Sequence, residues 1–446
     1  MTDNDIRWVA DADLCTGCGV CTSMCPHSAI VLNSDPIRGI YLPHIDENRC
    51  TGCGICLKTC SGHEFDFSKW NREIFGKIPE NILLGHYNEC YVGYTTQKEI
   101  RSHASSGGII TSLLLFLLNK GIIQGAIITK MNKDRPYDPE PFIARTEEDI
   151  LEGARSKYCP VPLGIILKEV IESKKEDKFA LVGLPCHINS ILKAESLNKD
   201  LKDKIILHIG LMCAHTNNFH GTTALMRSQH VAPENIKKIY YRGEGWPGLF
   251  QAEKIDGSRV AIPLKKFFDF THHTHFFTPR RCLLCYDATS EFADLSVGDA
   301  WNLPESRDDK EGTSIILSRT NKGETLLQML THEGILTLTP TSPEKIISSQ
   351  PGLIFTKKIG TRSRLAFLTL TRKKIPEYHA EFHPTSKLFS LYSVLLLINP
   401  KISQNSKLLD FVVSVPSTLF RPISLTQNFV SMAWLKIYKT KIEGVH

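Results

Sequence analysis

Two runs of cysteines near the start of the chain have residue types and spacing that suit iron–sulfur chemistry. Each run reads Cys-x-x-Cys-x-x-Cys-x-x-x-Cys, the first over residues 15–25 and the second over residues 50–60. Thiolates at this spacing hold 4Fe-4S clusters, and the fourth cysteine of each run serves the other cluster. We therefore predict one cluster on Cys15, Cys18, Cys21 and Cys60, and a second on Cys50, Cys53, Cys56 and Cys25. A pair of such clusters transfers electrons one at a time.

A zinc ribbon and a disulfide framework are the alternative interpretations of these runs. A zinc ribbon uses two Cys-x-x-Cys pairs, so the third cysteine of each run is surplus to its tetrahedral site. Disulfides need an oxidising compartment, and the chain does not open with a charged segment followed by an apolar one. Glycines between the ligands let the backbone turn tightly around a cluster; they are Gly17, Gly19, Gly52 and Gly54. Both alternatives are therefore disfavoured.

Four further cysteines form a weaker second set. Cys186 and Cys213 each follow a predicted buried strand, and Cys282-x-x-Cys285 adds a paired chelate. Loops at the carboxyl ends of strands are where open α/β sheets build their sites. The four could close a third 4Fe-4S cluster or hold a structural zinc, and their spacing does not decide between these. The two remaining cysteines, expected to be buried thiols, are Cys90 and Cys159.

Two short segments are candidates for binding a phosphate group. Ser105-Ser106-Gly107-Gly108 precedes an apolar run predicted to be a helix, and the free amides of a helix start favour an anion. An ordinary helix cap is the plain alternative. Arg155-Ser156-Lys157-Tyr158 combines two cations, a hydroxyl and an aromatic ring, which could clamp a flat, phosphorylated cofactor. Read alone, this second segment is a surface turn.

Two other patterns are weaker than they look. Residues 243–248 read G-x-G-x-x-G, but Pro247 and the strand-like residues after it predict a hairpin, so this is not a dinucleotide fingerprint. The histidines at 272, 273 and 275 have no matched carboxylate nearby, and we interpret them as a loop run rather than a metal site.

The elements that must position these residues follow from the hydrophobic pattern. After the cysteine runs, a polar and aromatic connector over 63–77 leads into alternating apolar runs. Helices are expected over 109–118, 163–171 and 187–194, and strands over 126–128, 179–182 and 205–211. This alternation favours a sheet with parallel pairs. Farther on, the Asp256-Gly257 turn between two strand-like runs indicates an antiparallel hairpin.

Composition points to a cytoplasmic globular protein. Hydrophobic residues make up 42% of the chain and charged residues 22%, which are ordinary proportions for that class. The chain of 446 residues is long enough for several domains. No apolar stretch approaches the roughly twenty residues that a membrane-spanning helix needs.

Positive charge is concentrated at the end of the chain. Residues 356–446 contain 14 Lys and Arg against 4 Asp and Glu, a local charge of +10 within a whole-chain charge of +6. Such a segment favours an acidic partner or an anionic surface, and a solvated basic face is the plain alternative. We expect docking on a larger complex or peripherally at the cytoplasmic face of a membrane. Nucleic-acid binding is disfavoured, because no groove-reading motif accompanies the charge.

Taken in order, the short motifs resemble a known family. They are Ser-Ser-Gly-Gly at 105–108, Ser-Lys-Tyr at 156–158, Gly-Leu-Pro-Cys at 183–186, Gly-Leu-Met-Cys at 210–213, Tyr-Arg-Gly-Glu-Gly-Trp-Pro-Gly at 241–248, Cys-x-x-Cys-x-Asp at 282–287 and Val-Gly-Asp-Ala-Trp at 297–301. The set resembles the β subunits of coenzyme F420 hydrogenase and dehydrogenase, here with an N-terminal two-cluster ferredoxin domain. (Coenzyme F420 is a deazaflavin.) The resemblance covers about residues 1–335.

The resemblance implies FAD in the central domain, with another 4Fe-4S cluster close to it. It implies that this cluster's ligands are Cys186, Cys213, Cys282 and Cys285, and that the flavin-phosphate side is formed by Ser106, Gly107, Gly108, Ser156 and Lys157. Asp299 and Trp301 map to the same region without an assigned role. The chain departs from the usual pattern at Ser61, where proline commonly follows the last cysteine; this leaves ligation intact and bears on the second cluster's potential.

We thus predict a multidomain protein of the α+β and α/β classes. Its parts are a ferredoxin-like two-cluster domain over 1–65, the family's N-terminal flavin-binding part over 85–175, its C-terminal part with the third cluster over 176–355, and a basic C-terminal extension over 356–446. The extension matches nothing in the family, and its role is open.

The predicted function is that of an iron–sulfur flavoprotein oxidoreductase. Reduced coenzyme F420 carries a hydride, clusters accept single electrons, and FAD can do both. We expect electrons to pass from reduced coenzyme F420 through FAD and the clusters to a ferredoxin or a partner redox subunit, or in reverse. The alternatives are a ferredoxin-dependent FAD reductase of an organic substrate and a non-catalytic electron-wiring subunit of a larger complex. The sequence singles out no catalytic residue.

Overall fold

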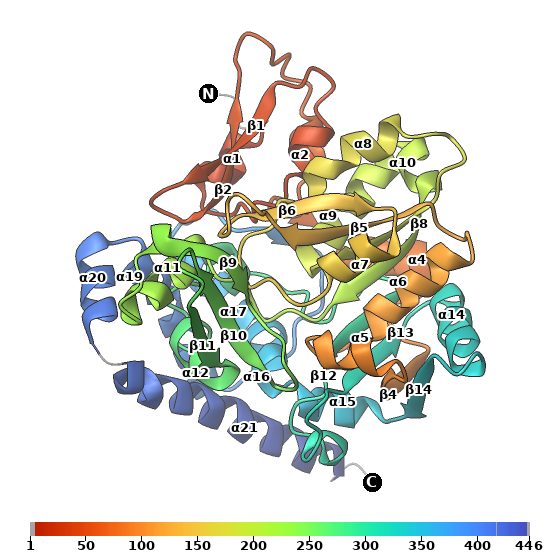
Figure 1. Ribbon diagram of the computed structural model, residues 1–446. Coiled ribbons are helices and arrows are strands. Elements are labelled where there is room, and N and C mark those ends of the chain that lie inside the picture. Colours follow the sequence, from red (N-terminus) through yellow and green to blue (C-terminus); the bar gives the residue numbers. More distant parts are fainter. Residues whose placement is uncertain (1–4, 416, 444–446) are drawn as a thin grey trace.

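The computed structural model describes residues 5–415 and 417–443, and it places a small cysteine-rich unit on a larger α/β body (Figure 1). The small unit, which we call the N-terminal module, comprises residues 5–62 and stands at the top of Figure 1. Its elements are α1 (Arg7–Asp11), α2 (Val20–Ser23), β1 (Ile30–Asp35), β2 (Ile40–Ile45) and α3 (Ile55–Lys58). β1 and β2 pair as an antiparallel hairpin.

The two cysteine runs fold alike. Each turns at a glycine before its short helix, with a φ of 82° at Gly19 before α2 and of 72° at Gly54 before α3. Residues with a side chain rarely adopt this left-handed conformation. The repeat in the sequence is therefore also a repeat in the structure.

An eight-stranded mixed sheet forms the centre of the body, in the order β14-β4-β13-β12-β8-β7-β5-β6. The neighbours β12, β8, β7 and β5 are parallel, which confirms the predicted parallel pairs, and the other neighbours are antiparallel. The strand bounds are β4 (Glu89–Thr95), β5 (Gly125–Met131), β6 (Pro139–Ala144), β7 (Phe179–Gly183), β8 (Ile205–Leu211), β12 (Leu295–Asp299), β13 (Ser314–Ser318) and β14 (Leu336–Pro340).

Helices cover both faces of this sheet, because side chains alternate between the faces along each strand. On β5, Ile127 packs in the core on one face, whereas Ala126 and Ile128 pack on the other. The first face is covered by α8 (Leu167–Glu172), α9 (Pro185–Leu197) and α10 (Lys199–Lys204), and the second by α6 (Ile109–Asn119), α7 (Glu147–Gly153) and α14 (Asn321–His332).

A second, three-stranded sheet lies beside the first. The antiparallel hairpin predicted at Asp256-Gly257 is confirmed, since it joins β10 to β11. The elements of this region are α11 (Phe219–Ser228), η2 (Pro233–Asn235), β9 (Ile236–Tyr240), β10 (Leu249–Lys254), β11 (Arg259–Pro263) and α12 (Leu264–Thr271). The remaining short elements of the body are α5 (Lys98–His103), η1 (Leu163–Ile166), α13 (Arg280–Leu283) and η3 (Pro304–Ser306).

The segment predicted as a polar and aromatic connector over 63–77 is folded and packed into a core. It forms β3 (Glu64–Phe65) and α4 (Phe67–Phe75), and Phe65, Phe67 and Trp70 are buried in the same core as α9. Their apolar area holds the module against the body, because burial of large aromatic side chains is favourable. β3 also pairs in parallel with β15 (Glu377–Tyr378) from the far end of the chain.

The described residues after 355, which are 356–415 and 417–443, pack back onto the body. Residue 356 lies inside a continuous helical stretch, and Trp434 and Leu435 join Phe355 in one buried core. Helix α21 runs along the bottom of Figure 1. The elements are α15 (Pro343–Ser349), α16 (Pro351–Ile354), the π-helical turn η4 (Phe355–Ile359), α17 (Gly360–Leu370), α18 (Lys387–Leu395), η5 (Leu396–Ile398), α19 (Pro400–Ser403), α20 (Ser406–Ser414), η6 (Ser417–Phe420) and α21 (Arg421–Glu443). Within the described residues, no helix combines the length and the apolar character needed to cross a bilayer.

Candidate functional site

The predicted ligands of the second cluster line one small cavity, which we call the outer pocket. Cys25 comes from the first run and lies there with the second run's first three cysteines, Cys50, Cys53 and Cys56. The amide of Ala29 donates a hydrogen bond of 3.3 Å to the Cys25 sulfur. Cys53 is exposed to solvent, so the outer pocket opens at the protein surface.

We call the predicted ligands of the first cluster, Cys15, Cys18, Cys21 and Cys60, the middle group. Cys18 and Cys21 are buried, and Cys15 and Cys60 are half-buried. Burial raises the pKa of Cys60 to about 11, and the thiol of Cys18 adds to the shift. Burial and then Cys60 likewise raise the pKa of Cys15. Groups influence one another in this way only when they are close together, so Cys60 joins the first run although it comes from the second.

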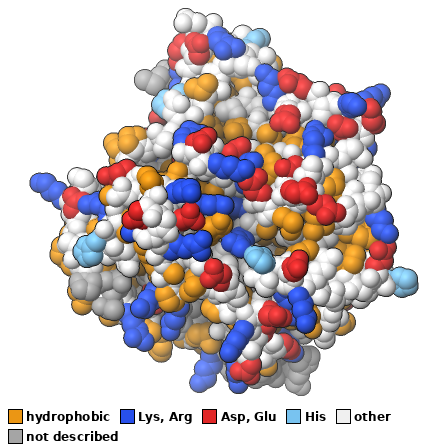
Figure 2. All heavy atoms as spheres, in the orientation of Figure 1, with side chains coloured by type: hydrophobic (Ala, Val, Ile, Leu, Met, Phe, Trp, Pro, Cys, Tyr) orange, Lys and Arg blue, Asp and Glu red, His pale blue; other side chains and the backbone are white. Residues whose placement is uncertain are grey.

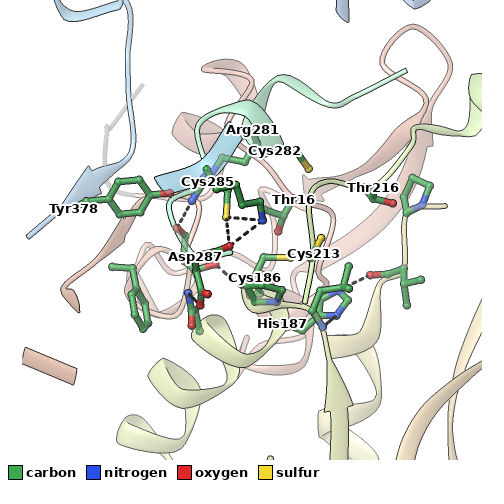
Figure 3. A pocket seen from close by; sticks show the side chains of 18 of the residues that line it. Thr16, Cys186, His187, Cys213, Thr216, Arg281, Cys282, Cys285, Asp287 and Tyr378 are labelled. Carbon is green, nitrogen blue, oxygen red and sulfur yellow. Dashed lines mark hydrogen bonds between the residues drawn. The ribbon is translucent and has the colours of Figure 1, made fainter. Parts of the chain in front are cut away.

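The four cysteines of the second set line one larger cavity, the inner chamber (Figure 3). Cys186 is the second residue of α9, which starts shortly after β7 ends, and Cys213 follows β8. Cys282 lies in α13 and Cys285 just after it. The cavity encloses about 660 Å³, including solvent at its mouth. Among the described residues, no three His, Cys, Asp or Glu side chains converge closely enough to hold a single metal ion.

Two buried cations face the thiols of the inner chamber. The Lys357 ammonium lies 3.4 Å from the Cys285 sulfur and donates to the carbonyl of Asp287 at 2.9 Å. Burial opposes the charge of Lys357, but the thiols of Cys285, Cys213 and Cys282 and the carboxylate of Asp287 together outweigh it and raise the lysine pKa. Arg281 also lines the chamber, and its Nε and Nη1 are buried without a hydrogen-bond partner among the described residues. Buried cationic donors require a counter-charge, and four thiolates around a cluster would supply one.

Ser61 joins the middle group to the inner chamber. Its amide donates to Ser190 Oγ at 3.2 Å, and its hydroxyl donates to the Cys186 carbonyl at 3.2 Å. Ser190 also donates to Ser61 Oγ at 2.8 Å and accepts from the Cys18 sulfur at 3.7 Å. Ser61 is the position where the sequence lacks proline, and its N–H and hydroxyl are both used here.

The two predicted phosphate-binding segments lie together. Ser105 Oγ accepts a hydrogen bond of 2.8 Å from the Ser156 amide. The Gly107 amide donates to Ser314 Oγ at 3.0 Å, and a Cβ at Gly107 would lie 2.6 Å from the Gly93 carbonyl oxygen. Gly107 therefore lets the loop before α6 approach β4 and β13 closely. No side chain caps α6. The ordinary side-chain cap that we had weighed is not formed.

Lys157 turns inward in this structure. Its ammonium donates to the carbonyls of Gly153, Ala154 and Arg155 at 2.5, 2.8 and 2.9 Å. These carbonyls end helix α7, where cations are favoured. Burial lowers the lysine pKa to about 7. Lys157 thus closes a helix here, and its contact with a phosphate stays a prediction.

A polar and aromatic group next to these segments was only partly expected. Arg242 is buried and pairs with Asp299 at 2.7 Å, and its guanidinium lies 5.3 Å from the centre of the Trp301 ring. The rings of Trp246 and Trp301 lie 4.8 Å apart. The buried atoms Arg242 Nη2, Asp299 Oδ1 and Trp246 Nε1 have no hydrogen-bond partner among the described residues. Sequence motifs indicated Trp246, Asp299 and Trp301, but nothing there indicated that Arg242 is buried.

The inner chamber and the group around Arg242 and Asp299 lie at one edge of the central sheet. Gly183 and Gly210 face each other near the carboxyl ends of β7 and β8, so Cys186 and Cys213 follow side by side. On the neighbouring strands, Asp299 at the end of β12 faces Ser314 at the start of β13. Ligands of open α/β sheets bind at this carboxyl edge.

The histidine run lies on the loop after α12, as predicted, and His272 and His275 are buried there. The rings of His272 and His275 lie 4.8 and 4.9 Å from that of His215. Burial lowers the pKa of all three, which keeps them neutral. They pack next to the inner chamber, whose lining includes Thr216.

The fold and the cysteine groups define an iron–sulfur redox protein, with a two-cluster module on an α/β body. The model of the 4Fe-4S dicluster domain matches residues 14–62. The models of the coenzyme F420 hydrogenase/dehydrogenase β subunit match residues 90–168 with its N-terminal part and 176–344 with its C-terminal part. The chain belongs to this family. Residues 345–446 lie outside all three matches.

Similar proteins carry related names. The coenzyme F420 hydrogenase subunit beta of Methanothermobacter thermautotrophicus is 28% identical over 290 residues, which is 64% of this chain and 93% of that one. The same-named subunit of Methanosarcina barkeri is 28% identical, over 63% of this chain and 89% of that one. A coenzyme F420-dependent sulfite reductase of Methanocaldococcus jannaschii is 26% identical, over 73% of this chain and 47% of that one.

A solved structure shares the fold. It is a chain of the F420-reducing [NiFe] hydrogenase complex from Methanosarcina barkeri, with a TM-score of 0.52 and 24% identity. The match covers 67% of this chain and 98% of that one.

Proposed function

We propose that this protein transfers electrons between reduced coenzyme F420 and single-electron acceptors, with FAD and three 4Fe-4S clusters as its resident cofactors. The observation that carries the proposal is the inner chamber, where four cysteines from distant parts of the chain meet two buried cations. Family membership and the names of the relatives support the choice of coenzyme F420 as the hydride carrier.

The three thiol sites would each hold one cluster, and each cluster would supply one-electron redox chemistry. The inner chamber would use Cys186, Cys213, Cys282 and Cys285, and the other two sites would use the ligands of the middle group and the outer pocket. The sites adjoin in series. Ser61 connects the chamber to the middle group, and the outer pocket reaches the solvent at Cys53. The surface around Cys53 is therefore the proposed contact for an electron-exchange partner.

FAD would bind at the carboxyl edge of the sheet and would convert between hydride and single-electron transfer. The hydrogen bond between Ser105 and Ser156 holds the two proposed phosphate-side segments together. The unpartnered polar atoms of Arg242, Asp299 and Trp246 suit a flat ligand with polar edges. These residues would orient the cofactor, and the apolar walls around them would exclude water.

The proposal is tested on protein purified without oxygen. We expect FAD and about twelve iron atoms per chain, since each of three clusters holds four, and we expect visible bleaching on adding reduced coenzyme F420. Flavin-free protein after reconstitution would overturn the proposal. Bleaching by reduced ferredoxin but not by reduced coenzyme F420 would instead favour the ferredoxin-dependent reductase of an organic substrate.

A second candidate function is that of an electron-wiring subunit in a larger redox complex. The observation that favours it is a set of exposed apolar side chains on the last helices. On α18, the side chains of Leu388, Leu391 and Leu395 are 73%, 59% and 51% exposed. Their spacing places them on one face of the helix, and large apolar faces exposed to water commonly mark interaction sites.

A further inference from the structure

The wall of the inner chamber includes a part of the chain that the family matches do not cover. The C-terminal family match ends at residue 344, yet Lys357 on η4 and Tyr378 on β15 both line the chamber. The segment that carries the chain's excess positive charge therefore reaches the candidate redox site.

Three residues of this segment contact α13 and the turn after it, which carry Cys282 and Cys285. Lys357 contacts the Cys285 sulfur at 3.4 Å, and Thr361 donates to the Cys285 carbonyl at 3.1 Å. Arg364 donates to the Leu283 carbonyl at 2.5 Å. Lys357, Thr361 and Arg364 are four and then three residues apart, so they lie on one face of the helical stretch from η4 into α17. This face contacts the end of α13 and the turn after it.

The two neighbouring lysines of η4 have different partners. Lys358 pairs with the carboxylate of Glu291. Lys357 is only 2% exposed, and the hydrogen bonds of its ammonium go to the Cys285 sulfur and the Asp287 carbonyl. A buried ammonium is costly unless a negative charge compensates it. As cluster ligands, the cysteines of the chamber would be thiolates placed to supply that charge.

We propose that Lys357 is a positioning residue that raises the reduction potential of the cluster in the inner chamber. This rests on the proposed third cluster. Hydrogen bonds to ligand sulfurs and local charge set the potentials of such clusters. Reduction adds one negative charge to the cluster, and a fixed ammonium at a ligand sulfur stabilises the more negative state. The C-terminal segment thereby makes the innermost centre a better electron acceptor.

The test is a potentiometric titration of the anaerobic protein, followed by electron paramagnetic resonance. The signal of the inner cluster is assigned as the one that Cys213→Ala abolishes. In Lys357→Met, which keeps length but removes charge, we expect the inner midpoint to fall by at least about 59 mV, a tenfold change for one electron. Lys357→Arg keeps the charge and should stay near the wild-type midpoint. The control Lys373→Met, at an exposed position beyond α17, should change nothing.

An unchanged midpoint in iron-replete Lys357→Met would overturn the proposal. If Lys357→Met loses the inner cluster, then Lys357→Arg decides: retention with the wild-type midpoint supports a role of the charge, and loss in both variants overturns it. A wild-type protein that shows only the signals of the N-terminal module would instead refute the third cluster itself. Failure of the proposed function and failure of this inference are thus distinguishable.

Discussion

Ser61 shows how a single residue can join two sites. Its buried hydroxyl donates to the Cys186 carbonyl, and the same oxygen accepts from Ser190. Proline has no hydroxyl and could make neither of these hydrogen bonds. It also has no backbone N–H, so the bond from the Ser61 amide to Ser190 Oγ would be lost. The departure from the usual motif is therefore part of the contact between the N-terminal module and the body.

Removing this hydroxyl should loosen the contact. In Ser61→Ala, the Cys186 carbonyl loses a buried donor, and we expect the free energy of unfolding to fall by about 1–3 kcal/mol. Urea unfolding of the anaerobic protein measures this loss. The control Ser23→Ala removes an exposed hydroxyl that donates to the Ile165 carbonyl and should cost less than about 0.5 kcal/mol. Equal losses in both variants would contradict a special role for Ser61.

At the scale of single residues, the sequence is most informative where chemistry fixes residue type and spacing. The grouping of Cys60 with the first run and of Cys25 with the second could be predicted, because a cubane needs four thiolates at set separations. Lys357, Arg281 and Arg242 could not be predicted. Their roles depend on which side chains tertiary packing brings beside them, and no local pattern records this.

The elements that carry the chamber are held together by a buried histidine. His208 on β8 contacts Glu195 of α9 at 2.8 Å and Asp294, just before β12, at 3.7 Å. Burial opposes the imidazolium charge, but the two carboxylates outweigh it and raise the histidine pKa to about 10. The histidine therefore links the elements that precede or bear Cys186, Cys213 and Asp299.

This pair of contacts predicts a pH dependence of stability. The folded-state pKa of His208 lies above the unfolded value of about 6.5, so its stabilisation is complete below about pH 6.5 and is lost as the pH rises toward 10. Across this range, we expect the unfolding free energy to decline by roughly 2–4 kcal/mol more in the wild type than in His208→Gln. Urea titrations at several pH values measure this difference. His332→Gln, at an exposed position, should keep the wild-type slope, and an identical slope in His208→Gln would refute the account.

Hydrophobic patterning predicted β5, β7 and β8 because their apolar runs are short, continuous and bounded by turns. It did not predict the strand order. In the sheet, β4 lies between β13 and β14, although β4 is far from both of them in the sequence. It also described residues 63–77 as a connector, because their aromatic residues are spaced among polar ones. Only the packed structure shows that Phe65 and Phe67 belong to the core.

At the scale of the whole molecule, the number of charged residues in 356–446 does not indicate which of their side chains are exposed to solvent. Lys357, Lys358 and Arg364 are buried and serve the body itself. What the segment exposes is a mixture of apolar and basic side chains, which Figure 2 shows along the lower edge over α21. On this helix Leu425, Phe429 and Met432 are exposed. Net charge is a sum over side chains and carries no information on their direction.

If the exposed apolar faces dock on a partner, charges placed there should release the chain from its assembly. We expect Leu391→Glu with Leu395→Glu to elute at the size of the isolated chain from a gently lysed host, while the wild type elutes in a larger complex. Iron and flavin content should not change. The matched control places glutamate at Leu197 and Ile255, which are exposed elsewhere. A double variant on α18 that stays in the complex would rule out this face.

Of the fourteen cysteines, Cys53 alone is exposed. If Cys53 holds the outer cluster as proposed, it is also the place where dissolved oxygen first meets the protein's redox sites. Oxidative damage should therefore begin at the outer end and would disconnect the interior centres from their partner before it destroys them. The working lifetime of the protein in air would then be set by the few residues around Cys53.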